Sequence, residues 1–206
     1  MHASEIAMIG RIVASATHEL NNVLGIVKDA GGLMSDVLKL NGGAVQHADK
    51  IDRAAGKIAP QVLRGTAITA ALNRFAHLMD DPRSKQDAAG LAETACLLMS
   101  RLARQRKVTL QSQPPRKDAQ VETDATRLFL MLCAMLDACA LQAGEDQTVT
   151  LAVERDKREV FFRALSPSAA PWPQEELARI AGELNLRLEP CKDSSQGGLC
   201  LAAPRA

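Results

Sequence analysis

A histidine, a carboxylate and an amide lie within about one helical turn of each other near the start of the chain: His18, Glu19 and Asn22. Side chains four residues apart are neighbours on one helix face, so the Asn22 amide is expected next to the His18 imidazole. An exposed imidazole beside a carboxylate can act as a nucleophile, because Glu19 can orient the ring or accept its proton. Zinc chemistry of the HExxH type is excluded, since position 22 is Asn and not a second His. From spacing alone, an ordinary surface histidine is the alternative.

The helix that carries these residues is marked by a heptad pattern. With Ile6 at position a, His18 falls at position f and points into solvent, while Glu19 falls at g beside the seam. We expect the helix to end near Asn41-Gly42-Gly43. Apolar residues alternate three- and four-residue steps, as in the a/d seam of a helical bundle: Ile6, Ile9, Val13, Ala16, Leu20, Val23, Val27, Ala30, Met34 and Val37.

A second apolar stripe runs from Ile51 to Met79, and Pro60 inside it predicts a kink. Two helices of similar length joined by a short turn make a helical hairpin over residues 1–81. Each helix presents an apolar stripe that one hairpin covers poorly. A homodimer, in which two hairpins form a four-helix bundle, would cover both stripes.

Residues 85–206 have a different pattern, in which helices and strands alternate. We expect helices over residues 91–103, from a cap at Thr123 or Asp124 to about 143, and from Pro173 to about 185. The predicted strands are 107–111, 147–154, 159–165, 186–189 and 199–203. This order predicts a small α/β sandwich with its helices on one sheet face. The fold class is therefore α+β, with the sandwich following the hairpin.

The segment THELNNVLGI at residues 17–26 resembles the H-box of bacterial histidine kinases, typically H-E-L-x-N-P-L-x-x-I. Its place in the first helix of a hairpin is similar to the family's dimerisation and phosphoacceptor domain. The resemblance implies that His18 is the phosphoacceptor. Glu19 and Asn22 also match an E-x-x-N arrangement that supports dephosphorylation of receiver domains in related proteins. Val23 stands where the family usually has proline, so a straighter helix is expected here.

The layout of residues 85–206 resembles the family's ATP-binding domain, but the asparagine-rich box that holds Mg²⁺ and phosphates is missing. The corresponding helix, residues 128–143, contains no Asn, and Ala134 and Ala138 align with its two key positions.

Two further nucleotide motifs of the family are absent. Residues 160–173 contain neither the Asp nor the Gly of the family's D-x-G-x-G adenine turn. Gly197-Gly198 lies just before the closing strand, which indicates a turn and not a phosphate-binding lid. The resemblance therefore implies a degenerate domain with no nucleotide or metal site of its own.

Dimeric histidine phosphotransferases, built as degenerate kinases, are the group that the chain resembles most. The resemblance implies a cytoplasmic phosphorelay protein that shuttles a phosphoryl group through His18 between response-regulator receiver domains. The receiver would supply the Mg²⁺. The alternatives are a response-regulator phosphatase using Glu19 and Asn22, a non-catalytic dimeric binding module, and an active sensor kinase.

Composition limits the other possible functions. The formal net charge is +1, and four Phe, one Trp and no Tyr are present, so nothing favours nucleic-acid binding. The first twenty residues lack a signal-peptide pattern, and the apolar run 128–143 is interrupted by Asp137 and too short for a membrane span. These features predict a cytoplasmic protein that does not associate with membranes.

Two groups of residues are interpreted structurally. The five cysteines form no CxxC pair or metal spacing, and mostly lie in apolar runs, which indicates small buried side chains. A cationic cluster near residue 104 suits a helix C-terminus, with a receiver-docking surface as the alternative. The members of the two groups are Cys96, Cys133, Cys139, Cys191 and Cys200, and Arg101, Arg104, Arg106 and Lys107.

Overall fold

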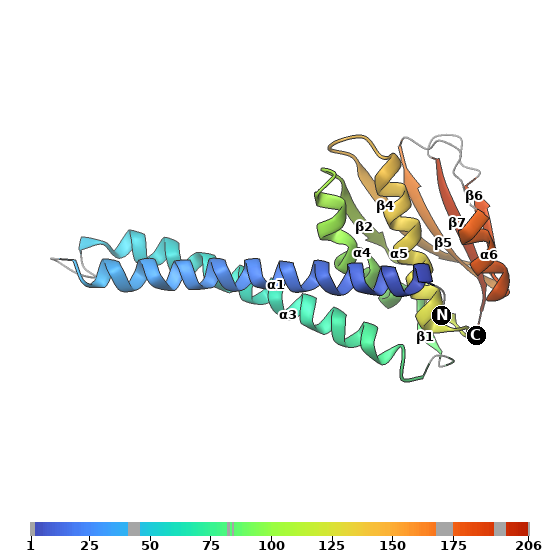
Figure 1. The fold of residues 1–206 in the computed structure, drawn as a ribbon, viewed down its shortest axis with the longest axis horizontal. Helices are drawn as coiled ribbons and strands as arrows, with labels where there is room; N and C mark the ends of the chain where they lie inside the picture. Colours follow the sequence, from blue (N-terminus) through green and yellow to red (C-terminus); the bar gives the residue numbers. More distant parts are fainter. Residues whose placement is uncertain are drawn as a thin grey trace.

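A long helical hairpin leads into an α/β sandwich in the computed structural model, which describes residues 3–40, 46–81, 83, 85–167, 175–191 and 197–205. Helices α1 (Ala3–Leu38) and α3 (Ala48–His77) lie side by side, and much of the hairpin extends away from the sandwich (Figure 1). α3 continues through Pro60 without ending there. The turn predicted at 41–43 lies outside the described residues.

The apolar side chains of α1 pack on two neighbours, α3 and the sandwich. Four seam residues at seven-residue spacing are buried: Ala16, Val23, Ala30 and Val37. Ile6 and Val13, also predicted in the seam, are 57% and 45% exposed in the single chain. Near its start, α1 instead buries Met8, Ile12 and Ser15, because this stretch packs on the sandwich as well as on α3.

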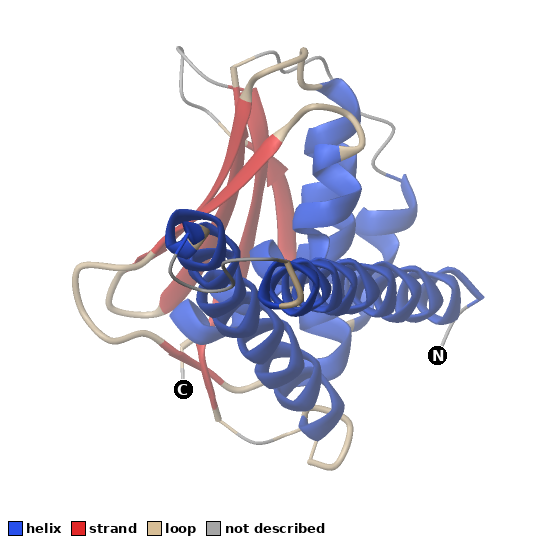
Figure 2. Cartoon of the chain, turned by 90° about the vertical axis from the view of Figure 1, so that its left-hand side faces the viewer, coloured by secondary structure: helices blue, strands red, loops and turns tan. Residues whose placement is uncertain are grey.

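The sandwich contains a five-stranded sheet in the order β2-β4-β5-β7-β6, in which β2 and β4 are parallel and the other neighbours antiparallel. Its helices lie on one side of the sheet (Figure 2). β5 alternates buried and half-buried residues, as expected of a strand covered on one face. The elements are β1 (Gln86–Asp87), α4 (Ala88–Arg104), β2 (Thr109–Gln113), β3 (Gln120–Val121), α5 (Ala125–Gln142), β4 (Thr148–Arg155), β5 (Glu159–Ser166), α6 (Glu175–Glu183), β6 (Arg187–Pro190) and β7 (Gly197–Pro204).

Local signals explain most element boundaries. Of the two candidate caps, Asp124 begins α5, because its carboxylate accepts a hydrogen bond from the Arg127 backbone N–H at 2.9 Å. The strand predicted at 107–111 begins two residues later, since Lys107 adopts a left-handed φ of 58° in a turn. The two-residue strands β1 and β3, which pair with each other, were not predicted.

The Gly197-Gly198 pair does not form the predicted turn. Both residues lie in β7, where Gly198 pairs with Leu165 and Gly197 with Ser166 of β5. A Cβ atom on Gly198 would overlap the carbonyl oxygen of Ala164. Gly198 is therefore required by close approach of two strands.

The core extends across the predicted boundary between residues 81 and 85. Phe75 of α3 packs against Phe129 of α5, with ring centroids 5.0 Å apart. α5 is apolar and long enough to pass a length-and-composition test for a membrane span, but 72% of it is buried inside the protein. It is the central core helix of the fold.

Burial of the cysteines is only partly as predicted. Cys96, Cys133 and Cys139 are buried, whereas Cys191 and Cys200 are half-buried near the β6–β7 edge of the sheet. They lie on the sheet face that the helices leave open, because their buried neighbours in β7, Leu199 and Leu201, point to the helix side.

Candidate functional site

His18 is exposed on α1 beside a groove of about 620 Å³. The groove lies where α1, α3 and the C-terminal end of α4 meet, so its walls come from both the hairpin and the sandwich. Its polar lining includes His18 and Asn22 from α1, Gln61 and Arg64 from α3, and Arg101 and Arg104 from α4. His18 and Asn22 thus share one face of α1, as their four-residue spacing predicts.

The Glu19 carboxylate is buried between two arginines. Arg104 donates a hydrogen bond to it at 2.6 Å, and Arg64 forms an ion pair with the same oxygen. Within the described part of the chain, the carboxylate makes no hydrogen bond to His18. From the sequence, Glu19 is expected to orient the imidazole or accept its proton. In the structure, its carboxylate instead fixes two guanidinium groups at the edge of the groove.

The groove has the charge pattern of an anion site. Arg64, Arg101 and Arg104 line it, together with the carboxylates of Glu19 and Asp29. Because Glu19 is already paired, and Arg101 forms no ion pair among the described residues, donors remain for an incoming anion. Guanidinium groups bind phosphate oxygens well, since their planar N–H donors match phosphate geometry.

From the sequence, two of these arginines are expected to complement a helix C-terminus, with a receiver-docking surface as the alternative. Arg101 and Arg104 suit the C-terminal end of α4, but both also reach the groove that contains His18. The other members of that cationic cluster lie elsewhere: Arg106 binds Asp137, and Lys107 binds Glu145 at 2.8 Å. Arg64 carried no signal in the sequence, because its position depends on how α3 packs against α1.

Ion pairs hold α1 on the sandwich near the groove. Arg11 and Arg106 both bind the Asp137 carboxylate of α5, with N–O distances of 2.8 Å. Burial raises the pKa of Asp137, but hydrogen bonds from Arg11 and Arg106 outweigh that effect and lower it overall. A second set joins Glu5 of α1 through Arg127 to Glu183, each at 2.7 Å.

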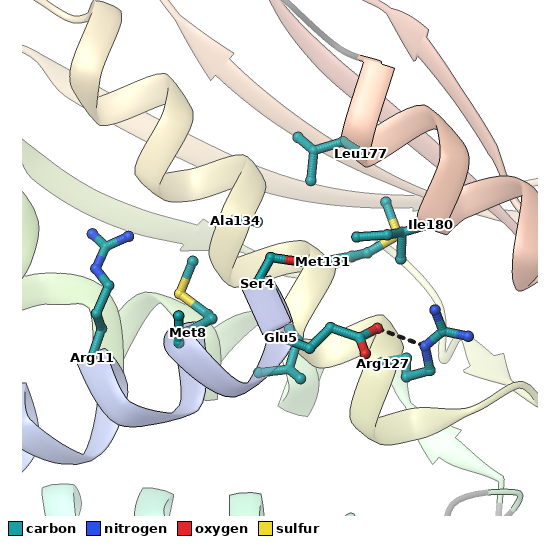
Figure 3. A pocket seen from close by; sticks show the side chains of 11 residues that line it. Ser4, Glu5, Met8, Arg11, Arg127, Met131, Ala134, Leu177 and Ile180 are labelled. Atoms are coloured by element: carbon teal, nitrogen blue, oxygen red, sulfur yellow. Dashed lines mark hydrogen bonds and ion pairs between the residues drawn. The ribbon is translucent and has the colours of Figure 1, made fainter. Parts of the chain in front are cut away.

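A smaller cavity of about 290 Å³ lies between the start of α1, α5 and α6 (Figure 3). Ala134, at the position of the first missing box residue, lines it beside Met8 and Met131. Of the charged side chains there, Glu5 and Arg127 bind each other, as Figure 3 shows, and Arg11 binds Asp137.

No protein-family model matches the chain, and no curated protein sequence matches it. Solved structures are similar to it in fold. The catalytic domain of histidine kinase ThkA superposes with a TM-score of 0.52 at 13% identity, over 60% of this chain and 97% of that domain.

Two larger kinase structures match almost all of the present chain. Histidine kinase ThkA in complex with response regulator TrrA gives a TM-score of 0.51 at 13% identity, over 98% of this chain and 63% of the kinase chain. Full-length ShkA in complex with AMPPNP gives 0.53 at 14% identity, over 96% of this chain and 46% of that chain. At these identities the likeness shows the fold, which is that of a histidine-kinase-like core.

Proposed function

We propose that this chain is a histidine phosphotransfer protein of a two-component phosphorelay, which carries a phosphoryl group on His18 between receiver-domain aspartates. One observation carries the proposal. An exposed histidine in an H-box-like segment lines an arginine-rich groove on a histidine-kinase-like fold. The chain lacks the family's nucleotide motifs, so the phosphoryl group would come from another protein and not from ATP.

The transfer step needs few groups from this chain. A lone pair of the neutral His18 imidazole attacks the phosphorus of a receiver's aspartyl phosphate. A nitrogen–phosphorus bond forms as the phosphorus–oxygen bond breaks, and the receiver aspartate leaves as a carboxylate. The receiver's own Mg²⁺ would neutralise phosphoryl oxygens during this exchange. The reverse chemistry delivers the group to a second receiver.

In this mechanism the arginines of the groove bind the phosphoryl group during transfer. Arg64 and Arg104 are held by Glu19 beside the groove, and Arg101 lines it from α4. Their donors would bind the phosphoryl oxygens as charge develops in the transition state. Glu19 is then a positioning residue, because its carboxylate acts through the two guanidinium groups.

A second copy of the chain would complete the hairpin. Several large apolar side chains are exposed there, among them Leu24 at 64% and Leu63 at 72%. Ile6, Val13 and Leu38 extend the same exposed set along α1. A homodimeric four-helix bundle would cover these residues. We also propose that the protein is cytoplasmic.

A response-regulator phosphatase is the second candidate, since Asn22 shares the groove with His18. In that reaction the Asn22 amide would position a water molecule for attack on the receiver's aspartyl phosphate. His18→Gln abolishes relay but need not abolish this hydrolysis, whereas Asn22→Ala would impair hydrolysis.

The deciding experiment mixes the protein with receiver domains charged by acetyl phosphate, and with ATP alone as a control. Relay predicts an acid-labile phosphate on wild-type protein and none on His18→Gln. Receivers that lose phosphate while the protein stays unlabelled would favour the phosphatase. Labelling by ATP alone would contradict the proposal, and no phosphate movement with any receiver would leave a binding module.

A further inference from the structure

Two cysteines lie next to each other near the β6 edge of the sheet, which is the edge opposite β2. Cys200 is in β7, opposite Glu189 of β6, and Leu199 pairs with Pro190. Cys191 continues this ladder, because its N–H donates to the Gly198 carbonyl at 2.9 Å. Residues two apart in a strand share a face, so Cys191 and Cys200 are diagonal neighbours on one face of the hairpin. The two thiols are close enough for each to shift the pKa of the other.

The pair differs from the other three cysteines in its surroundings. Cys191 and Cys200 are half-buried, while the others are enclosed in the core. Burial raises the pKa of Cys96 and of Cys139 to about 12, which keeps those thiols protonated and inert. The chain therefore contains internal controls for any reaction at the pair.

Charged neighbours distinguish the two thiols of the pair. The hydrogen bond from Cys191, together with the positive charge of Arg163, lowers the pKa of Cys200 to about 7, against opposing effects of burial and Glu189. Arg163 of β5 stands directly opposite Cys200 in the strand register. The same hydrogen bond raises the pKa of Cys191. Cys200 is thus the better nucleophile and Cys191 the proton donor to it.

We infer that Cys200 and Cys191 form a reactive dithiol that undergoes exchange with low-molecular-weight disulfides and closes to an intramolecular disulfide. The Cys200 thiolate attacks one sulfur of the small disulfide, whose S–S bond breaks and releases one small thiolate. Cys191 then loses its proton to solvent and attacks the Cys200 sulfur, releasing the second small thiol. Two electrons pass from the cysteines to the reagent, which is reduced to two thiols.

The test treats the full-length protein with oxidised glutathione near neutral pH and measures intact mass and peptide maps. Wild type should lose two hydrogens and contain a Cys191–Cys200 bond. Cys191→Ser should stop at a glutathione adduct on Cys200, and Cys200→Ser should stay unmodified at this pair. Cys96→Ser is the matched control and should react as wild type does.

A second readout separates reactivity from simple exposure. The rate of alkylation at Cys200 should rise with pH around a midpoint near 7 in wild type, following its pKa. That midpoint should move upward in Cys191→Ser, which removes the hydrogen bond, and in Arg163→Gln, which removes the charge. An unshifted midpoint, or a wild-type glutathione adduct that never resolves, would overturn the inference. His18→Gln should react as wild type, since the dithiol is independent of phosphotransfer.

Discussion

Arg11 of α1 and Asp137 of α5 form a two-point ion pair, in which Nη1 donates to Oδ2 and Nη2 to Oδ1, each at 2.8 Å. The two residues are 126 positions apart, and their pair ties the helix that carries His18 to the core helix of the sandwich. Arg106 donates to the same carboxylate at 2.8 Å. Asp137 is only 9% exposed, so its charge depends on both partners.

Removal of one partner should destabilise the fold. In Arg11→Met, the Asp137 carboxylate stays buried with Arg106 alone, and we expect the free energy of unfolding to fall by about 1–3 kcal/mol. Urea denaturation measures this change. Lys39→Met is the control, because Lys39 and Asp36 form an exposed pair, and its effect should stay within about 0.5 kcal/mol. Equal effects of the two substitutions would contradict the conclusion that the Arg11–Asp137 ion pair between α1 and α5 stabilises the fold.

The same carboxylate predicts a pH dependence of stability. The folded-state pKa of Asp137 lies below its ordinary value of 3.8, so the ionised group stabilises the fold fully above that value. This contribution is lost as pH falls through the folded-state pKa. The stability difference between wild type and Asp137→Asn should therefore be constant near neutral pH and shrink in acid. Denaturation curves over a pH series measure it, and a difference unchanged into acid would exclude this linkage.

Gly198 should tolerate no side chain. A Cβ there overlaps the Ala164 carbonyl oxygen in the neighbouring strand, so Gly198→Ala forces β5 and β7 apart. We expect a loss of about 1–3 kcal/mol in unfolding free energy. Gly182→Ala is the matched control, since a Cβ on this exposed helical residue meets nothing within 4 Å. That substitution should stabilise by about 0.5–1 kcal/mol, and a loss similar to that of Gly198→Ala would refute the argument.

Periodicity in the sequence accounts for the elements that could be predicted. The spacing of Ala16, Val23, Ala30 and Val37 reflects contacts within one hairpin, which local sequence encodes directly. Alternation in β4 and β5 is local in the same sense, as is the cap at Asp124. His18 and Asn22 share a face for the same reason, because one helical turn fixes their separation.

Features that depend on distant contacts could not be predicted. Arg104 lies 85 residues from Glu19, and only the packing of α4 on α1 brings them together. Gly198 is typical of a turn in the sequence, but the β5–β7 register places it against Ala164. Cys200 likewise lies in an apolar run, and the exposure of Cys191 and Cys200 depends on which sheet face the helices leave uncovered.

The exposed apolar side chains of the hairpin predict a dimer that a single charge disrupts. Leu24→Glu or Leu63→Glu would place two carboxylates per dimer in the bundle core, and we expect the dissociation constant to rise about 100-fold or more. Light scattering after size-exclusion chromatography measures the association. Leu141→Glu is the control, because Leu141 is 60% exposed but lies on α5 in the sandwich. Dimers that persist in both hairpin variants would place the interface elsewhere.

Arg101 gives the cleanest test of the groove beside His18. Substitution of Arg64 or Arg104 would also release the buried Glu19, whereas Arg101 forms no ion pair in the part of the chain that is described. If its guanidinium binds phosphoryl oxygens in the transition state, Arg101→Gln should slow phosphotransfer to His18 by roughly 10–100-fold and leave unfolding free energy unchanged.

Single-turnover kinetics with a phosphorylated receiver measure that rate. Arg101→Lys keeps the charge but loses the planar pair of donors, so it should recover only part of the rate. Arg74→Gln is the matched control, because it removes the same charge from the hairpin outside the groove. If Arg74→Gln slows transfer as much as Arg101→Gln does, the groove arginines act only through the overall charge of the protein, and direct binding of the phosphoryl group at Arg101 is excluded.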